Sequence, residues 1–301
     1  MTARPDVVVV TGASSGFGNL TARTSARAGH TVFAGMRAAT GRNASAVAAL
    51  AELRRTRGLP TAAVEMDVQD QASVGTAIGR VMAEQGRVDV VVHNAGHTVP
   101  GPAEAFTTAQ LADFHDVNAL STQRVNRAVL PLMRAQGRGL LVWVGSSSTR
   151  GGHPPFLAPC FAARGAMDAL AESYAGELVR FGIETALVVP GAFPSGTSRF
   201  AHAGTPADTS CAEQYEEPYG RLRARMEDAL SAMFPSGREA GEVAAGIVRI
   251  VGLPHGERPF RTHTDPSRDG SEVVSAVYDR VRAEFFRRVG IDELLTAHPS
   301  L

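Results

Sequence analysis

The sequence contains no lysine, since all 30 of its Lys and Arg positions are arginines. This absence excludes mechanisms that need a lysine amine, such as a Schiff base, a phosphate-loop lysine or a lysine general base. Arginine stays charged at any working pH, so none of these cations can serve as a proton donor or acceptor. A preference for arginine codons explains surface positions, whereas at a catalytic position the loss of lysine changes the chemistry.

Cysteine, net charge and long apolar runs are also scarce. Cys160 and Cys211 are the two cysteines, too few for a disulfide framework and without metal-ligand spacing, so we expect no metal site. The 30 acidic residues balance the arginines and leave no overall field to recruit nucleic acid or an anionic membrane. No apolar run approaches the roughly 20 residues of a membrane span, and no signal region precedes the first strand pattern. We therefore expect a cytoplasmic protein that binds a small molecule, with no nucleic acid and no membrane partner.

The first 190 residues alternate between apolar strand-like segments and helical segments. Strands are predicted at 6–11, 31–36, 61–66, 88–93, 139–145 and 183–189, and helices at 17–28, 45–57, 71–85, 107–135 and 159–181. Strands joined by helical crossovers form right-handed βαβ units. The pattern predicts an α/β fold with a doubly wound parallel sheet of the Rossmann type.

The pattern changes after residue 190. Residues 191–237 are rich in Pro, Gly, Ser, Thr and Ala, with a helix at 219–232; helices at 239–251 and 272–289 flank a short strand at 258–262. No segment has the composition of a linker. We therefore expect a single domain over 1–301, with a core at 5–190 and a substrate loop and C-terminal extension at 191–301. Phe156, Phe193 and Phe200 are expected to contribute to an apolar lid over a hydrophobic substrate, although such aromatics also occur in cores.

A glycine-rich turn joins the first predicted strand to the first helix. It reads TGASSGFG over 11–18, with glycines in the spacing Gly-x-x-x-Gly-x-Gly. Glycines at a strand-to-helix turn let backbone N–H groups approach a pyrophosphate at the helix N-terminus. We expect a dinucleotide to be bound there, by Gly12, Ser14, Ser15, Gly16, Phe17 and Gly18.

This spacing, and the motifs that follow it in order, resemble the short-chain dehydrogenase/reductase family over most of the chain. The matching residues are Asp67, Val68, Asn94, Ala95, Gly96, Asn118, Pro190, Gly191 and Ser195. The resemblance implies that Asp67 and Val68 hold the adenine, and that the motifs at 94–96 and 190–195 bind the rest of the cofactor. It also implies that Asn118 belongs to a proton relay.

The end of the second predicted strand bears on the choice of cofactor. Residues 34–37 read AGMR and contain no carboxylate of the kind that binds the ribose hydroxyls of NAD. Arg37 can instead pair with a 2′-phosphate, or it is an exposed loop arginine. We expect NADP(H) rather than NAD(H).

The catalytic motif of the family is replaced in this chain. The resemblance implies a Tyr-x-x-x-Lys motif at the start of the helix after the fifth strand, and this sequence has Cys160 and Arg164 there. Counting back by the family's usual spacing selects Ser147 as the serine that orients the substrate carbonyl. Arg164 can bind ribose hydroxyls but cannot pass on a proton. Cys160 reaches roughly 4 Å less far than tyrosine, so water, a deeper substrate pose or another residue must bridge the gap; alternatively Cys160 is a small buried hydrophobe.

Two histidines are candidates for the missing acid. His153 lies between Ser147 and Cys160, and His97 follows Gly96. Imidazole titrates near neutrality and is a competent general acid, although a lone histidine is more often an ordinary loop residue.

Three functions are compatible with this pattern. The first is an NADP(H)-dependent oxidoreductase that reduces a carbonyl of a hydrophobic or polycyclic substrate with an atypical proton donor. The second is a non-redox cyclase, isomerase or dehydratase on the same fold, and the third is an inactive cofactor-binding protein. The resemblance also implies a homodimer or homotetramer, paired through the long helices after the fourth and fifth strands.

Overall fold

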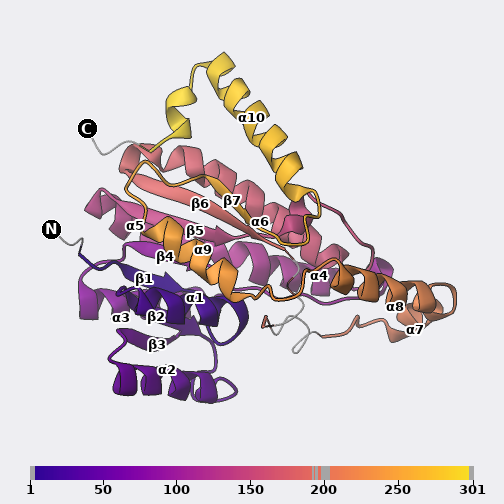
Figure 1. Ribbon diagram of the computed structural model, residues 1–301. Coiled ribbons are helices and arrows are strands. Elements are labelled where there is room, and N and C mark those ends of the chain that lie inside the picture. The colour runs from indigo at the N-terminus through magenta and orange to yellow at the C-terminus, as the bar shows by residue number, and fades with distance from the viewer. Residues whose placement is uncertain (1–3, 192, 194–195, 198–203, 298–301) are drawn as a thin grey trace.

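The computed structural model describes residues 4–191, 193, 196–197 and 204–297. Within them, seven strands form one parallel sheet in the order β3-β2-β1-β4-β5-β6-β7 (Figure 1). The strands are β1 (Val7–Val10), β2 (Thr31–Met36), β3 (Thr61–Glu65), β4 (Val90–His93), β5 (Gly139–Val144), β6 (Ile183–Pro190) and β7 (Arg261–Thr264). The predicted doubly wound parallel sheet is confirmed.

Helices cover both faces of this sheet. One layer contains α1 (Gly16–Arg27), α2 (Ala44–Arg57) and α9 (Gly241–Val251), and the other contains α3 (Gln71–Gln85), α5 (Ser121–Gln136) and α6 (Ala158–Glu177). Successive β1 residues point to opposite faces, because side chains alternate along a strand. Val8 therefore packs in the cluster that includes Ile247 of α9, and Val9 in the cluster that includes Val129 of α5. A run of four valines suits a strand that is buried on both faces.

The helix predicted over 107–135 is divided in the structure. It consists of α4 (Thr108–His115), a π-helical segment (Asp116–Leu120) and α5. Asn118 lies in the π-helical segment and is fully buried. Short π segments occur inside α-helices at functional sites, and this one turns Asn118 toward the end of β4.

The last strand lies at Arg261–Thr264, later than the predicted 258–262. Pro259 has no N–H to donate to a sheet, which delays the start of the strand. Arg258 instead bonds to Glu184 of β6 and to the Ile250 carbonyl.

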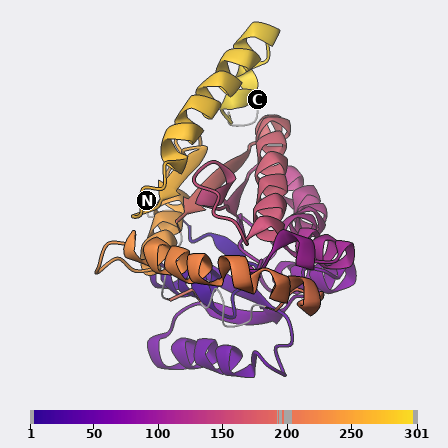
Figure 2. The same cartoon turned by 90° about the vertical axis from the view of Figure 1, so that its right-hand side faces the viewer.

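Beyond β6, three helices surround the sheet without belonging to its two layers. They are α7 (Thr209–Gln214), α8 (Glu216–Ala232) and α10 (Ser271–Val289). In both views α10 projects away from the body of the molecule (Figure 2). None of the helices in the described ranges is both long enough and apolar enough to span a membrane.

Candidate active site

A pocket opens at the carboxyl ends of β1, β4, β5 and β6. Its lining comes from the glycine-rich turn after β1, the loop at 94–98 after β4, the end of β5, the start of α6 and the residues after β6. The chain runs outward in opposite directions from β1 and β4, so this edge is a topological switch point of the sheet. Ligands of open α/β sheets bind at such points.

The glycine-rich turn is braced by the loop after β4. Asn94 Nδ2 donates to the carbonyl oxygens of Thr11 (2.9 Å) and Gly12 (3.1 Å), and the N–H groups of Asn94 and Ala95 both donate to Thr11 Oγ1 at 3.0 Å. These bonds fix the turn relative to β4. Ser15, Gly16 and Phe17, at the start of α1, line the pocket.

Three glycines of this turn are required by geometry. Gly12 and Gly16 have φ of +64° and +54°, a conformation that L side chains rarely adopt. A Cβ at Gly18 would overlap both Asn94 Nδ2 and the Gly12 carbonyl oxygen. Ser15 caps α1 without a side-chain hydrogen bond, and the first turn of α1 has no acidic residue. The turn therefore fits an anionic phosphate at a helix N-terminus.

The adenosine end of the predicted site lies at the ends of β2 and β3. Arg37 is exposed and donates through Nη1 to Gln69 Oε1 at 3.4 Å. The Glu65 carboxylate accepts the N–H groups of Ala38 and Ala39, each at 2.7 Å. Ala38 has φ of +49°, so two successive N–H groups here form a small anion-binding concavity.

Asp67 and Val68 occupy the loop that follows β3. Asp67 is partly buried; its N–H donates to Ser73 and its Oδ1 accepts the N–H of Gln69 at 3.0 Å. Val68 is buried in the core that includes α3. An adenine contact by these two residues stays a prediction.

Cys160 and Arg164 both reach the pocket from the first turns of α6. Cys160 is buried, and its Sγ lies 3.2 Å from Thr98 Oγ1, a hydrogen bond in which either group can donate. Arg164 Nη1 donates to the Val144 carbonyl at 3.0 Å and contacts Met167 Sδ. The pocket therefore holds a thiol, a hydroxyl and a fixed cation. Nothing in the sequence pattern had marked Thr98.

Gly96 lies directly against two polar side chains of the predicted site. A Cβ at this position would overlap Arg164 Nη2 and Asn118 Oδ1, so both groups lie directly against the glycine backbone. Asn118 Nδ2 donates to the Phe114 carbonyl at 3.0 Å, while its Oδ1 is buried without a hydrogen-bond partner. Such a buried acceptor needs a donor from water or ligand.

The three consecutive serines point in different directions. Ser146 lines the pocket, and its hydroxyl lies 2.7 Å from that of Ser148. Ser147, the predicted substrate-orienting residue, is buried and hydrogen-bonds to Asp269, where it helps to lower the pKa of that carboxyl. Successive side chains of this short 3₁₀ turn cannot face the same way, so a count along the chain is insufficient to choose among them.

The two candidate histidines differ in position. His97 lines the pocket and stacks on Phe114, with ring centroids 4.8 Å apart. Burial lowers the pKa of His97, as do Arg37 and Arg164, against an opposing effect of Asp113. His153 is exposed on the loop before α6, and its ring meets Phe161 edge-on. The structure therefore brings His97, but not His153, to the pocket.

The remaining predicted residues are distributed as follows. Pro190 and Gly191 line the pocket, whereas Ser195 and Phe200 lie outside the described residues. Phe193 lines the pocket but is also buried against Phe17 and Phe234, so it belongs to the core as much as to a lid. No group of three or more metal-ligating side chains occurs in the described ranges.

The parallel sheet, the glycine-rich turn and the pocket at the switch point define a dinucleotide-binding oxidoreductase fold. The short chain dehydrogenase family model matches residues 6–204, and the chain belongs to that family.

Two curated relatives illustrate the range of the family. A 3-ketodihydrosphingosine reductase of Bacteroides thetaiotaomicron is 29% identical over 264 residues, covering 87% of this chain and 89% of that protein. The 17-beta-hydroxysteroid dehydrogenase type 1 of Mus musculus is 36% identical over 194 residues, covering 62% of this chain and 54% of that protein. Both names denote oxidoreductases.

Solved structures share the same fold. A short-chain dehydrogenase from Streptomyces avermitilis superposes with a TM-score of 0.72 at 29% identity, covering 95% of this chain and 98% of that one. An actinorhodin polyketide ketoreductase variant, solved with NADPH, gives a TM-score of 0.70 at 24% identity, covering 87% and 96%.

Proposed function

We propose that this protein is an NADP(H)-dependent reductase of a carbonyl group on a small hydrophobic molecule, with a proton donor other than tyrosine. The observation that carries the proposal is the Cys160–Thr98 pair. It opens onto the same pocket as the glycine-rich turn and stands where the family motif has its tyrosine. The cofactor's binding residues and a proton-bearing group thus share one cavity.

Arg37 supports NADP(H) over NAD(H). It follows β2 directly, and no carboxylate from the end of β2 is present to bind ribose hydroxyls. A guanidinium binds a phosphate monoester with two parallel hydrogen bonds. The ketoreductase structure with NADPH is a precedent for this cofactor on the same fold. When bound, the nicotinamide supplies a hydride.

Arg164 and Ser146 would hold the reactants in place. Arg164 is fixed by its bond to the Val144 carbonyl, with its other terminal nitrogen against Gly96, in reach of a ribose hydroxyl. Ser146 offers a hydroxyl at the end of β5 to orient a substrate carbonyl. The unpartnered Oδ1 of Asn118 would accept a hydrogen bond from a water beside Arg164.

Cys160 is our proposed proton donor to the carbonyl oxygen. The Thr98 hydroxyl would donate a hydrogen bond to the resulting thiolate. His97 is the weaker choice because burial lowers its pKa, which disfavours the protonated imidazolium that would donate the proton. His153 is also a weaker choice, because it is exposed on the loop before α6 and does not line the pocket. Because the thiol reaches less far than tyrosine, we expect its general acid catalysis to lie at the lower end of the typical range of about 10²–10⁴-fold, and an activated or reactive ketone to be the substrate.

Part of the pocket lining is apolar. Val144 and Phe193 line it together with Cys160, and outside this lining Phe156 packs on Tyr219 of α8. The relatives named for a ketosphingosine and for a hydroxysteroid act on molecules with large hydrocarbon parts. We therefore propose a hydrophobic or polycyclic ketone.

The test is NADPH oxidation by the purified protein with a panel of hydrophobic ketones, including polycyclic ones. We expect turnover with at least one ketone, reduced about 10²-fold or more in Cys160→Ala and preserved in the matched variant Cys211→Ala. Binding of NADPH without any oxidation across the panel would count against the proposal.

A non-redox enzyme on the same fold is the second candidate. The loss of tyrosine together with the retained Ser146–Ser148 hydroxyl pair favours it, because a cyclase or dehydratase needs polar groups but no net hydride transfer. Conversion of substrate without any change in nicotinamide absorbance would support this candidate, and equal amounts of product and NADP⁺ would exclude it.

We further propose that the protein is cytoplasmic and works as a homodimer or homotetramer paired through α5 and α6. These two helices lie side by side on one face of the sheet, with Tyr174 of α6 bonded to Gln123 of α5 at 2.5 Å. Light scattering of the purified protein checks the assembly, and a monomer at all concentrations would contradict it.

A further inference from the structure

The helix α10 exposes its apolar side chains and buries polar ones. Seven large apolar residues, here called the apolar stripe, are more than 40% exposed: Val273, Val274, Val277, Tyr278, Val281, Phe285 and Val289. Val273 is 70% exposed, Phe285 57% and Val281 54%. Five of the stripe residues follow one another at intervals of four, so they form one ridge along the helix. A surface helix normally turns such a ridge toward its own core.

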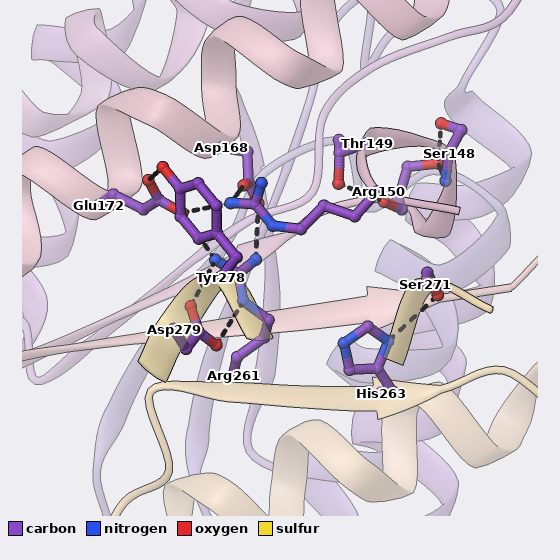
Figure 3. Close-up of polar contacts among 11 residues, drawn as sticks. Ser148, Thr149, Arg150, Asp168, Glu172, Arg261, His263, Ser271, Tyr278 and Asp279 are labelled. Carbon is purple, nitrogen blue, oxygen red and sulfur yellow. Dashed lines mark hydrogen bonds and ion pairs between the residues drawn. The ribbon is translucent and has the colours of Figure 1, made fainter. Parts of the chain in front are cut away.

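The opposite side of α10 is held to the body by polar contacts. Ser271 and Ser275 are buried, and the Arg261 guanidinium of β7 bonds to Asp279 (Figure 3). Arg282 donates to the Glu172 carbonyl and lies over the Phe260 and Phe286 rings. These contacts fix the orientation of the helix, so the apolar stripe cannot rotate inward.

Contacts of Tyr278 with α6 also hold α10 to the body of the molecule. The Tyr278 hydroxyl donates to Glu172 at 2.9 Å, and its ring lies 3.9 Å from the Arg150 guanidinium carbon. Arg150 and Arg261 both bond to Asp168 and Glu172, as Figure 3 shows. Removing one partner from a buried ionic network of this kind is strongly destabilising, because it leaves a buried charge unpaired. The exposed stripe is therefore a feature of the folded chain, not of a loosely attached tail.

The charged residues beside the apolar stripe indicate which partner packs on it. Arg280 and Glu284 are exposed one turn apart near the middle of α10, and neither forms an ion pair within the described part of the chain. A second α10 running antiparallel would place Arg280 opposite Glu284 of the other copy, and Glu284 opposite its Arg280. A parallel arrangement would place like charges together. The edge of the stripe is thus complementary to itself under a two-fold axis.

The composition of α10 disfavours a membrane as the occupant. Glu272, Asp279 and Glu284 nearly balance its arginines, whereas helices that lie on anionic membranes have a strongly basic polar face. The stripe runs for roughly 25 Å along the helix, and contiguous apolar patches larger than a few hundred Å² on a soluble protein usually mark interaction sites.

We propose that α10 is a self-association surface, on which α10 of a second copy of this chain packs antiparallel along the apolar stripe. The crossing point is near Val281, with Arg280–Glu284 pairs on its flank. This surface is separate from α5 and α6, so the two interfaces together would produce a tetramer.

The first experiment measures molar mass by light scattering over a range of concentrations. Val281→Glu places a charge in the centre of the stripe, and Ala276→Glu places the same charge on an exposed position of the same helix outside it. We expect Val281→Glu to halve the mass of the wild-type assembly and Ala276→Glu to leave it unchanged. Unchanged NADPH binding would show that both variants are folded.

Charge reversal tests the antiparallel arrangement. Arg280→Glu and Glu284→Arg should each weaken the assembly about 10-fold, because each creates two like-charge contacts, and the double variant should restore it. A cysteine cross-link gives an independent check. In a Cys211→Ser background, Val281→Cys should form an oxidised dimer and Ala276→Cys should not.

Several outcomes would overturn the proposal. They are a wild-type chain that is monomeric at all concentrations, an equal mass for Val281→Glu and wild type, and a double charge variant no better than the single ones. A monomer that sediments with vesicles of anionic phospholipid would assign the stripe to a membrane instead.

Discussion

The glycine-rich turn and the start of α6 face the same pocket, but they differ in how many residue types the structure tolerates at their positions. At the turn, function rests on the backbone: Gly12 and Gly16 need positive φ, and Gly18 has no room for a Cβ. At the start of α6, function rests on side chains that project into a cavity. There Cys160 and Arg164 stand where we expect the tyrosine and lysine of the family motif, and both lie on the regular helix α6. Binding geometry is therefore constrained by the fold, whereas proton chemistry changes without disturbing it.

The strongest test of this contrast restores the family motif. Cys160→Tyr combined with Arg164→Lys should raise ketone reduction by up to about 10²-fold, the difference between the roughly 10²-fold attributed to Cys160 and the upper end of the typical range of general acid catalysis. Steady-state rates of NADPH oxidation provide the measurement, with Arg164→Lys alone as the control. A double variant that binds NADPH but shows no gain would mean that the pocket itself has diverged.

At the glycine-rich turn, by contrast, adding even one methyl group should weaken cofactor binding. Gly18→Ala should weaken NADPH binding about 100-fold, since its Cβ overlaps Asn94 and the Gly12 carbonyl and costs about 2–3 kcal/mol. Gly79→Ala in α3 is the matched control, because nothing lies within 4 Å of its Cβ. Cofactor fluorescence titration measures both. Equal affinities would show that the turn is not held as tightly as its contacts indicate.

Strand β4 lies between β1, which leads into the glycine-rich turn, and β5, which precedes α6. The stability of the fold at this strand should decrease at acidic pH. His93 is fully buried, with its Nε2 2.8 Å from Asn126 Oδ1, and burial lowers its pKa from 6.5 to about 4. As pH falls, the unfolded chain binds the proton first, so the folded state loses stability below about pH 6.5. We expect a loss of about 2 kcal/mol between about pH 7 and about pH 5 from this group. Denaturant unfolding of wild type and His93→Asn should show a weaker pH dependence in the variant; identical slopes would contradict it.

The smallest expected effect concerns Arg37. Arg37→Ala should weaken NADPH binding about 10-fold and leave NADH binding unchanged, as expected for an exposed charge-assisted contact to a phosphate. Arg42→Ala, an exposed arginine on the same loop, serves as the control. An equal loss for the two cofactors would place Arg37 away from the 2′-phosphate.

The sequence predicts the sheet well because its signals are local. The valine runs of β1 and β4 and the glycines that end α2 and α3 set strand and helix bounds within a few residues. The order of the glycine-rich turn, Asn94–Gly96 and Pro190-Gly191 likewise predicts one pocket. By contrast, the π-helical segment around Asn118 has no local signal, because its pattern matches an ordinary helix.

Side-chain direction and tertiary partners were harder to predict. Counting along the chain selects Ser147, but the 3₁₀ turn directs Ser146 into the pocket and Ser147 toward Asp269, more than 100 residues later in the chain. Thr98 gains its place only through contact with Cys160. The exposed stripe of α10 has the same cause. Its spacing predicts a helix correctly, but only the Arg261 and Glu172 contacts determine which face is turned outward.

The Glu65 carboxylate has a consequence for how the loop after β2 meets a ligand. Because it already accepts the N–H groups of Ala38 and Ala39, the loop is held in shape before any ligand arrives. An anionic ligand that binds these two N–H groups must displace the Glu65 carboxylate, which then becomes solvated by water. The Glu65 side chain therefore competes with the ligand for the same donors, and Glu65→Gln should raise the affinity of the loop for phosphate.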